Sequence, residues 1–288
     1  MYNNYMRTLI VDKKYNEKKL NTFLLENFNG LTMNTLYKAL RKKDIKINGK
    51  RISENVIVHI NDEIQIYISD DFLFKTQSFE ALYEDDNIVV FNKPVSLEVT
   101  GENSLTSYLK NSGKYQFIEP CHRLDRNTTG LVLYAKNEVA LNIILNKFKS
   151  HEIEKHYLCT VIGTPKKDSA TLCAYLFKDN KKSIVYISDA PKKGYQKILT
   201  SYKILETDIK NNLTKLDVEL HTGKTHQIRA HLAHIGNPIL GDGKYGINEI
   251  NKKFGKKTQQ LCSYKLKFNF TSDSDILNYL AGKEISLS

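Results

Sequence analysis

The sequence predicts an α+β protein in which a large domain follows a small module. The module is expected at residues 1–70, a linker at residues 71–78 and the large domain at residues 79–288. A length of 288 residues allows one domain of ordinary size with a small companion, and a hydrophobic content of 41% is enough for sizeable cores. From about Phe79 onward, many β-rich runs alternate with few helical ones. This order predicts a large, mostly antiparallel mixed sheet with flanking helices.

The first seventy residues are predicted to form two helices followed by a small β-ribbon. Apolar residues at helical spacing predict one helix over 20–28 and another over 36–40. Asn48-Gly49 marks a tight turn between isoleucine-rich flanks. Two short strands are then expected at 56–60 and 64–68, joined by a turn into the ribbon.

Basic residues outnumber acidic ones by 43 to 32, which gives a formal net charge of +11. Such an excess favours a polyanionic partner, although many basic proteins bind none. Within the module, basic side chains gather on the second helix and around the turn beyond it. The candidate residues of this cluster are Arg41, Lys42, Lys43, Lys46, Lys50 and Arg51. Charge alone leaves two interpretations open: a solvated helix face, or a surface that holds phosphate groups.

The order of these features resembles the α-L motif, a small RNA-binding module named after a ribosomal small-subunit protein. The match lies in LNTFLLENF, the basic second helix, IKINGKRI and NDEIQIYI. The resemblance implies that residues 1–70 form an RNA-binding module, in which the second helix and the turn at Asn48-Gly49 face RNA.

The large domain is predicted from several strand candidates and two helices. The strand candidates are NIVVF, GLVLYAK, HYLCTVIG, KSIVYI, TKLDVELH and YKLKFNF. One helix is expected over 138–152, where apolar residues fall on one face. The other is expected over 226–236, and it ends at Gly236 before Pro238.

Several classes of protein and site are set aside by what the sequence lacks. No apolar run approaches the roughly 18 residues of a membrane span, and the start lacks the apolar segment of a signal peptide. The four cysteines form no CxxC pair, so we expect a reducing cytoplasm rather than a disulfide framework or zinc ribbon. GxGxxG, GxxxxGK[ST] and HExxH are absent, so nucleotide cofactors and zinc hydrolysis have no visible motif. Four histidines lie between His221 and His234 without an acidic or cysteine companion, so no metal is expected.

The most informative stretch is HRLDRNTTGLVLYAK, residues 122–136. Asp125 lies between Arg123 and Arg126 in a polar loop that continues into an apolar strand. Guanidinium groups that point at a carboxylate favour its charged form. The alternative is an exposed aspartate with incidental ion pairs, which is the usual fate of a lone aspartate. The residue types alone leave both interpretations open.

This stretch closely resembles the signature of the RluA-type pseudouridine synthases, which isomerise uridine to pseudouridine in structured RNA. Further matches occur in order: YEDDNIVVFNKP precedes it, and FKSHEIEKHYLCTVIG, LHTGKTHQIRAHLAHIGNPILGDGKYG and QLCSYKLKF follow. The resemblance covers roughly residues 80–270. It implies an isomerase without a cofactor, because the reaction breaks the glycosidic bond, turns the uracil and rejoins it without net redox change.

The resemblance also assigns roles to individual residues. Asp125 matches the catalytic aspartate, and Arg229 matches the basic residue paired with it. Tyr157 matches the tyrosine that lies against the target base and is held to remove the proton from carbon five. Arg123 matches the arginine thought to fill the space left by the flipped uridine, and Leu261 matches a substrate-binding position in the closing strand.

The sequence departs from the family pattern at a few positions. The first motif reads KPVSLEVTGENS in place of the usual Gly and His-Pro, Lys224 stands where arginine is usual, and Cys262-Ser263 replaces His-Ala. None of these positions is Asp125, Tyr157 or Arg229. They therefore bear on substrate contacts rather than on the catalytic set.

We expect an RNA pseudouridine synthase that flips a uridine out of structured RNA. Large-subunit ribosomal RNA is the favoured substrate, transfer RNA is the alternative, and a monomer is expected. A non-catalytic RNA-binding ribosome assembly factor or RNA chaperone is the main rival. A glycosidic hydrolase is less well supported, because it would want a second carboxylate and the motif offers Asn127.

Overall fold

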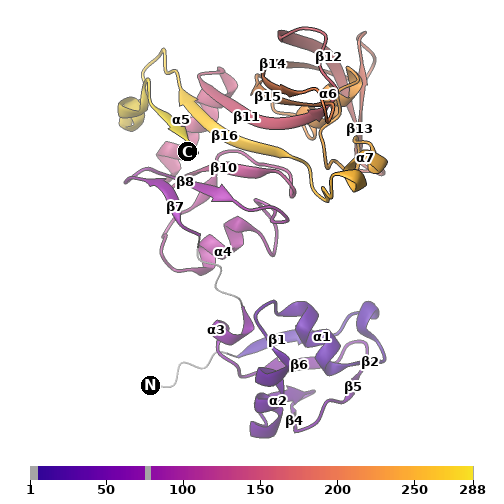
Figure 1. Cartoon of the computed structure of the whole chain (residues 1–288). Coiled ribbons are helices and arrows are strands. Elements are labelled where there is room, and N and C mark those ends of the chain that lie inside the picture. The colour runs from indigo at the N-terminus through magenta and orange to yellow at the C-terminus, as the bar shows by residue number, and fades with distance from the viewer. Residues whose placement is uncertain (1–5, 75–78, 288) are drawn as a thin grey trace. The chain divides into compact units, whose positions relative to one another are not determined.

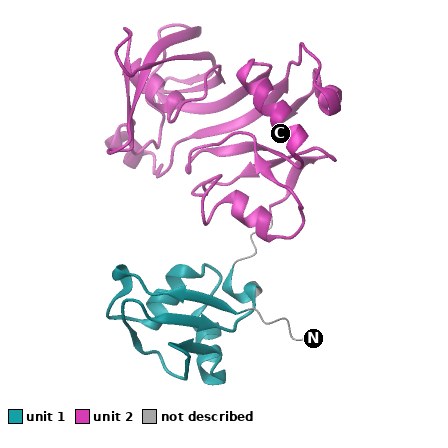
Figure 2. Cartoon of the chain, turned by 180° about the vertical axis from the view of Figure 1, so that it is seen from behind, with its two compact units in different colours: residues 1–78 teal, residues 79–288 magenta. Residues whose placement is uncertain are grey.

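The computed structural model describes residues 6–74 and 79–287. The chain divides into two compact units, residues 1–78 and residues 79–288, which Figure 2 colours separately. Each unit is built around hydrophobic clusters of its own. No helix in the described ranges is both long and apolar enough to cross a membrane.

A four-stranded antiparallel sheet lies at the centre of the first unit (Figure 1). Its strand order is β1 (Arg7–Ile10), β6 (Glu63–Ile66), β3 (Ile45–Ile47) and β4 (Lys50–Ile52). Helices α1 (Leu20–Asn27) and α2 (Met33–Lys42) pack their apolar faces into one cluster with the isoleucines of this sheet. The remaining elements of the unit are η1 (Lys13–Tyr15), β2 (Lys18–Lys19) and β5 (Ile57–Val58).

The predicted ribbon of residues 56–60 and 64–68 is wrong. Strand β5 pairs with β2, whereas β6 pairs with β1 and β3. Ile64 and Ile66 are fully buried, so their strand belongs to the core sheet and not to a peripheral hairpin. Strand β1 was not predicted, because three of its four residues are exposed and show no apolar alternation.

The segment predicted as a linker, residues 71–78, begins inside a short helix, α3 (Asp70–Leu73). Leu73 is fully buried in the hydrophobic cluster of the first unit. Asp70 forms an ion pair with Arg7 of β1 at 2.6 Å. This helix is therefore packed as part of the first unit, and residues 75–78 lie outside the described residues.

The second unit is built on an 11-stranded sheet. Its main path runs β13 (Ile184–Ser188), β12 (Ser169–Asp179), β14 (Gln196–Asp208), β15 (Leu213–Leu220), β11 (Ile153–Ile162), β16 (Leu261–Phe268), β10 (Thr129–Ala135), β8 (Ile88–Lys93) and β7 (Ala81–Glu84). The short strands β9 (Glu119–Pro120) and β17 (Glu284–Ser286) pair with β10 and β16. Among the described strand pairs of this sheet, only β10 and β16 run parallel. The predicted large, mostly antiparallel sheet is confirmed.

Helices cover both faces of this sheet. Helices α4 (Leu105–Asn111) and α6 (Gln227–His234) share a hydrophobic cluster with Val132 and Tyr134 of β10. Helix α5 (Glu138–Lys149) shares another with Leu131 and Leu133. Because successive residues of a strand point to opposite faces, α4 and α6 lie on one face and α5 on the other. Helices were predicted over 138–152 and 226–236, and α5 and α6 lie there; a further helix, α7 (Asn248–Lys253), follows α6.

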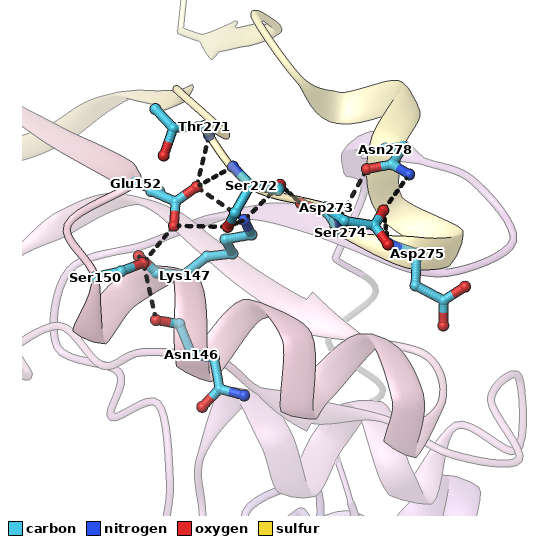
Figure 3. A network of polar contacts seen from close by, with 10 residues as sticks. All are labelled: Asn146, Lys147, Ser150, Glu152, Thr271, Ser272, Asp273, Ser274, Asp275 and Asn278. Atoms are coloured by element: carbon cyan, nitrogen blue, oxygen red, sulfur yellow. Dashed lines mark hydrogen bonds and ion pairs between the residues drawn. The ribbon is translucent and has the colours of Figure 1, made fainter.

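A polar network joins the end of α5 to the segment after β16 (Figure 3). The Lys147 ammonium donates to Glu152 Oε2 at 2.8 Å and to the Ser272 carbonyl at 2.9 Å. The Thr271 N–H donates to the same carboxylate at 2.7 Å. The Lys147 and Glu152 side chains are only 5% and 11% exposed. This network fixes the chain ahead of the 3-10 helix η2 (Asp275–Leu280) and β17.

Candidate active site

Asp125 lies in the loop between β9 and β10, where its carbonyl accepts a hydrogen bond from the Thr128 N–H at 3.0 Å. The loop enters β10 at Thr129, and the next residue, Gly130, has φ +106. A Cβ at this position would lie 2.1 Å from the Ser263 carbonyl oxygen of β16, so glycine is required where the two parallel strands meet. This close approach places the loop of Asp125 at the centre of the sheet.

Arg229 of α6 holds the carboxylate of Asp125. Its Nη1 donates to Asp125 Oδ2 at 2.8 Å. On its other side, Nε and Nη2 donate to the two carboxylate oxygens of Asp242 at 2.6 and 3.0 Å. One guanidinium therefore bridges two carboxylates, which are 104 residues upstream and 13 residues downstream in the chain.

Burial decreases steadily along this Asp242–Arg229–Asp125 chain. The exposed fractions of the three side chains are 0%, 8% and 27%. Asp242 also accepts the backbone N–H groups of Lys244 and Tyr245 at 2.8 and 3.1 Å. Burial alone would raise the pKa of Asp242, but hydrogen bonding to Arg229 outweighs it and lowers that pKa. Likewise, burial would lower the pKa of Arg229, and the two carboxylates raise it instead. The buried ion pair therefore stays charged, and Asp125 is the end that faces solvent.

Tyr157 and Leu261 come from neighbouring central strands. Tyr157 lies in β11 at a register shift in the pairing with β16, and it is 4% exposed. Leu261 begins β16, pairs with Cys159 and is 5% exposed. Burial raises the pKa of the Tyr157 hydroxyl, so the free protein carries it as a neutral phenol.

These side chains surround an open cavity beside Asp125. Its volume is about 980 Å³, and Arg123, Asp125 and Tyr157 are in its wall. A smaller recess of about 60 Å³ shares these three residues and adds Arg229 and Leu261. The structure thus brings together all the residues that the sequence selected in the large domain. A cavity of this size accommodates a nucleotide.

Of the two interpretations left open for Asp125, pairing with its neighbours Arg123 and Arg126 is not seen among the described contacts. Arg126 Nε donates to the Ser96 carbonyl at 3.3 Å, and its side chain is exposed. Arg123 is also exposed and lines the cavity. The guanidinium that contacts Asp125 is that of Arg229, because α6 packs against the same face of the sheet as Tyr157.

Two further residues close to Asp125 were not singled out from the sequence. His226 adopts a left-handed conformation, with φ 54, at the N-terminus of α6. Its Nε2 lies 4.0 Å from Asp125 Oδ2, and its Nδ1 lies 2.9 Å from the Tyr245 hydroxyl. Burial lowers the pKa of His226, although the charge of Asp125 opposes this shift.

Lys93, at the end of β8, is the second of these residues. It is fully buried, and its ammonium donates to the carbonyls of Pro94, Leu97 and Arg126 at 2.8, 2.7 and 3.1 Å. Burial lowers its pKa to about 8, against the raising effect of Asp125. Lys93 therefore ties the loop after β8 to the loop that carries Asp125. The Lys-Pro pair at the end of a strand was the available signal.

The candidate RNA-binding residues of the first unit lie at the end of α2 and on β3 and β4, at one edge of its sheet. Arg41 and Lys42 end α2, and Lys43 is its left-handed C-cap, with φ 59. Lys46 of β3 lies opposite Arg51 of β4, and Lys50 precedes Arg51. We call Lys46, Lys50 and Arg51 the hairpin cluster. Lys50 and Arg51 are exposed, whereas Lys46 is half-buried with its ammonium 5.1 Å from the centre of the Tyr67 ring.

Comparisons with known proteins agree with this geometry. Residues 87–234 match the family model described as RNA pseudouridylate synthase. An uncharacterized RNA pseudouridine synthase of Mycoplasma capricolum is 31% identical, over 97% of this chain and 97% of the relative. The ribosomal large subunit pseudouridine synthase C of Rickettsia prowazekii is also 31% identical, over 93% and 92%. Among solved structures, human RNA pseudouridylate synthase domain containing 1 shares the fold, with a TM-score of 0.61 and 20% identity over 74% of this chain and 84% of that one.

Proposed function

This chain belongs to the RNA pseudouridylate synthase family, and from that premise we propose that it acts on uridine in large-subunit ribosomal RNA through Asp125, Arg229 and Tyr157. The family and the reaction class, isomerisation of uridine in RNA, rest on the similarity over most of the chain. The RNA class rests on the names of the Rickettsia relatives, and transfer RNA remains the alternative substrate.

The ion pair between Asp125 and Arg229 is the observation that carries the assignment of roles. The reaction breaks the bond between uracil N1 and the ribose anomeric carbon, and then joins that carbon to carbon five of the base. Asp125 acts on the ribose and must be ionised to do so. Arg229 orients its carboxylate and supplies a counter-charge, because the guanidinium lies 2.8 Å away and is itself fixed by a buried carboxylate.

The walls of the cavity fit the base. The Tyr157 ring and Leu261 supply apolar surface, on which a detached uracil can turn without leaving the site. The carbon-five proton is lost and N1 of the base gains one, which completes the isomerisation without net change. We assign the relay to the neutral Tyr157 hydroxyl, whose oxygen accepts the carbon-five proton as its own O–H proton passes toward N1. The target nucleotide must leave its stack to enter the cavity, which costs a few kcal/mol. We assign the filling of the vacated space to Arg123, which is exposed and lines the cavity.

We further propose that residues 1–70 are an α-L RNA-binding module and that residues 79–288 are the catalytic domain. The basic residues at the end of α2 and the hairpin cluster support this assignment, because phosphate contacts supply most of the affinity of RNA-binding surfaces. The four cysteines are free thiols, which supports a cytoplasmic site of action.

Tritium release from RNA labelled at carbon five of uridine tests the proposal. We expect the full-length protein to release tritium from large-subunit ribosomal RNA transcripts. Asp125→Asn should lower kcat by about 10⁴-fold or more and leave RNA affinity nearly unchanged, because the amide keeps the shape but not the charge. Turnover that survives in Asp125→Asn would contradict the catalytic role. Release from transfer RNA alone would transfer the proposal to that substrate, and tight binding without release from any RNA would favour a binding-only role.

A further inference from the structure

Lys155 is a cation in the active-site cavity that no partner neutralises. It precedes Tyr157 by two residues in β11, and its half-buried side chain lines the cavity of about 980 Å³ beside Asp125. Its ammonium lies 4.6 Å from the centre of the Phe148 ring, and a Cβ at Gly223 would be 4.0 Å from it. In the described part of the chain, no oxygen accepts a hydrogen bond from this ammonium and no carboxylate lies within ion-pair distance.

Lys93 is a lysine near the same site whose ammonium does have hydrogen-bond acceptors. Burial lowers the pKa of each of the two lysines to about 8. Lys93, however, donates to three carbonyl oxygens and cross-links two loops. A half-buried ammonium that gains no acceptor loses part of its hydration, and a bound anion or loss of the proton recovers that free energy. Lys155 is therefore open toward a ligand, and Lys93 is not.

The acidic residues on neighbouring positions have partners of their own. Glu154 binds Asn269 and the His156 ring, and Asp217 binds the other nitrogen of that ring at 3.2 Å. Glu219 lies 3.3 Å from His221. None of these carboxylates is left over for Lys155.

His122 does not supply the missing negative charge either. Its Nε2 accepts the Leu133 N–H at 3.1 Å, so the neutral ring carries its proton on Nδ1. Burial lowers the pKa of His122 to about 3, and the nearby charge of Lys155 adds to this effect against the Arg123 backbone, which raises the pKa. The ring is therefore a neutral neighbour of the ammonium.

We propose that the Lys155 ammonium binds a backbone phosphate of the RNA next to the target uridine. The proposal rests on the function proposed above, because the nucleotide in the cavity must bring its phosphates with it. The cavity is large enough for a nucleotide together with a flanking phosphate. A phosphate oxygen would give the ammonium its missing acceptor and counter-charge. Lys155 thus fixes the position of the RNA backbone while Asp125 and Tyr157 act on ribose and base.

The charged and titratable groups of the cavity define the background against which Lys155 titrates. They are Glu98 after β8; Cys121, His122, Arg123, Asp125 and Arg126 before β10; Lys149 and His151 at the end of α5; Tyr157 in β11; Lys178 in β12; and His221 and Lys224 after β15. Because phosphate favours the charged ammonium, RNA binding should raise the pKa of Lys155 from about 8. The Lys155–phosphate contact then contributes fully to RNA affinity below the free-protein pKa of about 8, and this contribution is lost as the pH rises through the higher pKa of the complex.

Substitution by methionine tests the contact, because methionine keeps an apolar stem against Phe148 and removes the charge. Binding to a large-subunit ribosomal RNA transcript is measured as a function of salt concentration for the full-length protein. We expect Lys155→Met to bind about tenfold more weakly and to reduce the salt slope by about 0.7–0.9. The matched control is Lys210→Met, an exposed lysine in the turn after β14 that lines no described cavity and should bind as the wild type does. Equal binding by the two variants would overturn the proposal.

A pH series with Lys155→Arg makes the test independent of how well the methionine variant folds. Wild-type affinity should decrease about fivefold between pH 7 and pH 9, because the free ammonium has a pKa of about 8 and a tenfold contact raises it by about one unit in the complex. Lys155→Arg stays charged throughout, so its affinity should stay level. If the RNA affinity of Lys155→Arg decreases with pH as that of the wild type does, the titrating group is another residue and the inference is wrong.

These binding experiments are separable from the test of the proposed function, because they need no turnover. Tritium release by the wild type together with an unchanged Lys155→Met variant would reject the phosphate contact alone. Weak binding by Lys155→Met without tritium release by the wild type would keep the contact and reject the proposed reaction.

Discussion

Asp242 is the residue on which the site's charge depends, although it lies away from the cavity. One guanidinium between two carboxylates leaves a net charge of −1 on the three side chains. Asp242 is fully buried and saturated by Arg229 and two backbone N–H groups, so it has no capacity for another partner. The negative charge available for reaction is therefore that of Asp125.

Asp242→Asn should show whether Asp242 positions Arg229 for the reaction or only stabilises the fold. The amide keeps the volume but accepts less well from Arg229, so the guanidinium is free to move toward Asp125 and to neutralise it. We expect kcat to decrease by about 100-fold, with a smaller change in KM, in the tritium-release assay. Asp189→Asn, which alters an 86% exposed aspartate paired with His234, is the control and should leave kcat unchanged. A lower Tm with normal kcat would mean that Asp242 serves stability alone.

The sequence selected Asp125, Tyr157 and Arg229, and the structure brings the three together. It did not select Asp242, Lys93 or Lys155. The reason is physical: a buried polar residue is recognised by its partners, and the partners of Lys93 include a carbonyl 33 residues away in the chain. Asp242 stands between Gly241 and Gly243 in a stretch already compared with the family, but nothing local distinguishes it from a turn aspartate.

At the scale of elements, the network at the end of α5 anchors two strands at once. Lys147 and Glu152 bracket the turn between α5 and β11, and Ser272 and Thr271 follow β16 (Figure 3). Hydrogen bonds within the network lower the pKa of Glu152, with that from Lys147 contributing most. The pair therefore stabilises the fold at neutral pH, where the Glu152 carboxylate is charged.

Lys147→Met should lower the Tm of the protein by on the order of 5 °C at pH 7, because it leaves a carboxylate enclosed without its cation. The folded-state pKa of Glu152 is depressed, so this contribution is present above the unfolded pKa of about 4.3 and is lost as the pH falls below it. The difference in Tm between wild type and variant should therefore shrink below that pH in a calorimetric series. The control is Lys149→Met, an exposed lysine in the same turn of helix. A difference that stayed constant down to pH 3 would contradict the assignment.

Helices and strands with a regular spacing of apolar residues were predicted from the sequence, whereas those that mix apolar and polar residues irregularly were not. Strands β10 and β11 and helices α5 and α6 were expected from their periodicity. The long strand β14 was missed, because many of its residues are exposed and polar, as at Lys203 and Glu206. The pairing of β5 with β2 was also missed, since strand partners are set by the buried residues of the whole unit rather than by the nearest turn.

At the scale of the whole molecule, a net charge of +11 is divided between two units that each present basic residues. As a proposed site of phosphate contacts, the hairpin cluster of the first unit should contribute to RNA affinity and take no part in the chemical step. Its effect should therefore appear in KM and in salt dependence and be absent from kcat.

The triple variant Lys46→Gln, Lys50→Gln and Arg51→Gln tests this division of labour. We expect the salt slope of RNA binding to decrease by about 2–3 and the affinity to decrease by about 10²-fold at moderate salt, because up to three phosphate contacts are removed. Saturating RNA should restore the wild-type kcat. A control triple variant, Lys13→Gln, Lys18→Gln and Lys19→Gln, changes three exposed lysines of the same unit. Equal losses in both variants would show that only total charge matters.

The position of β16 has a consequence for the order of folding. This strand lies between β11 and β10 in the sheet, yet Thr129 of β10 and Leu261 at the start of β16 are 132 residues apart in the chain. Contacts so distant in sequence form late, because loop closure must precede them. During synthesis on the ribosome, Asp125, Tyr157 and Leu261 can therefore line one cavity only after residues 261–268 have emerged and paired with both β11 and β10. A nascent chain that lacks β16 has not yet assembled this cavity, so we expect it to be inactive.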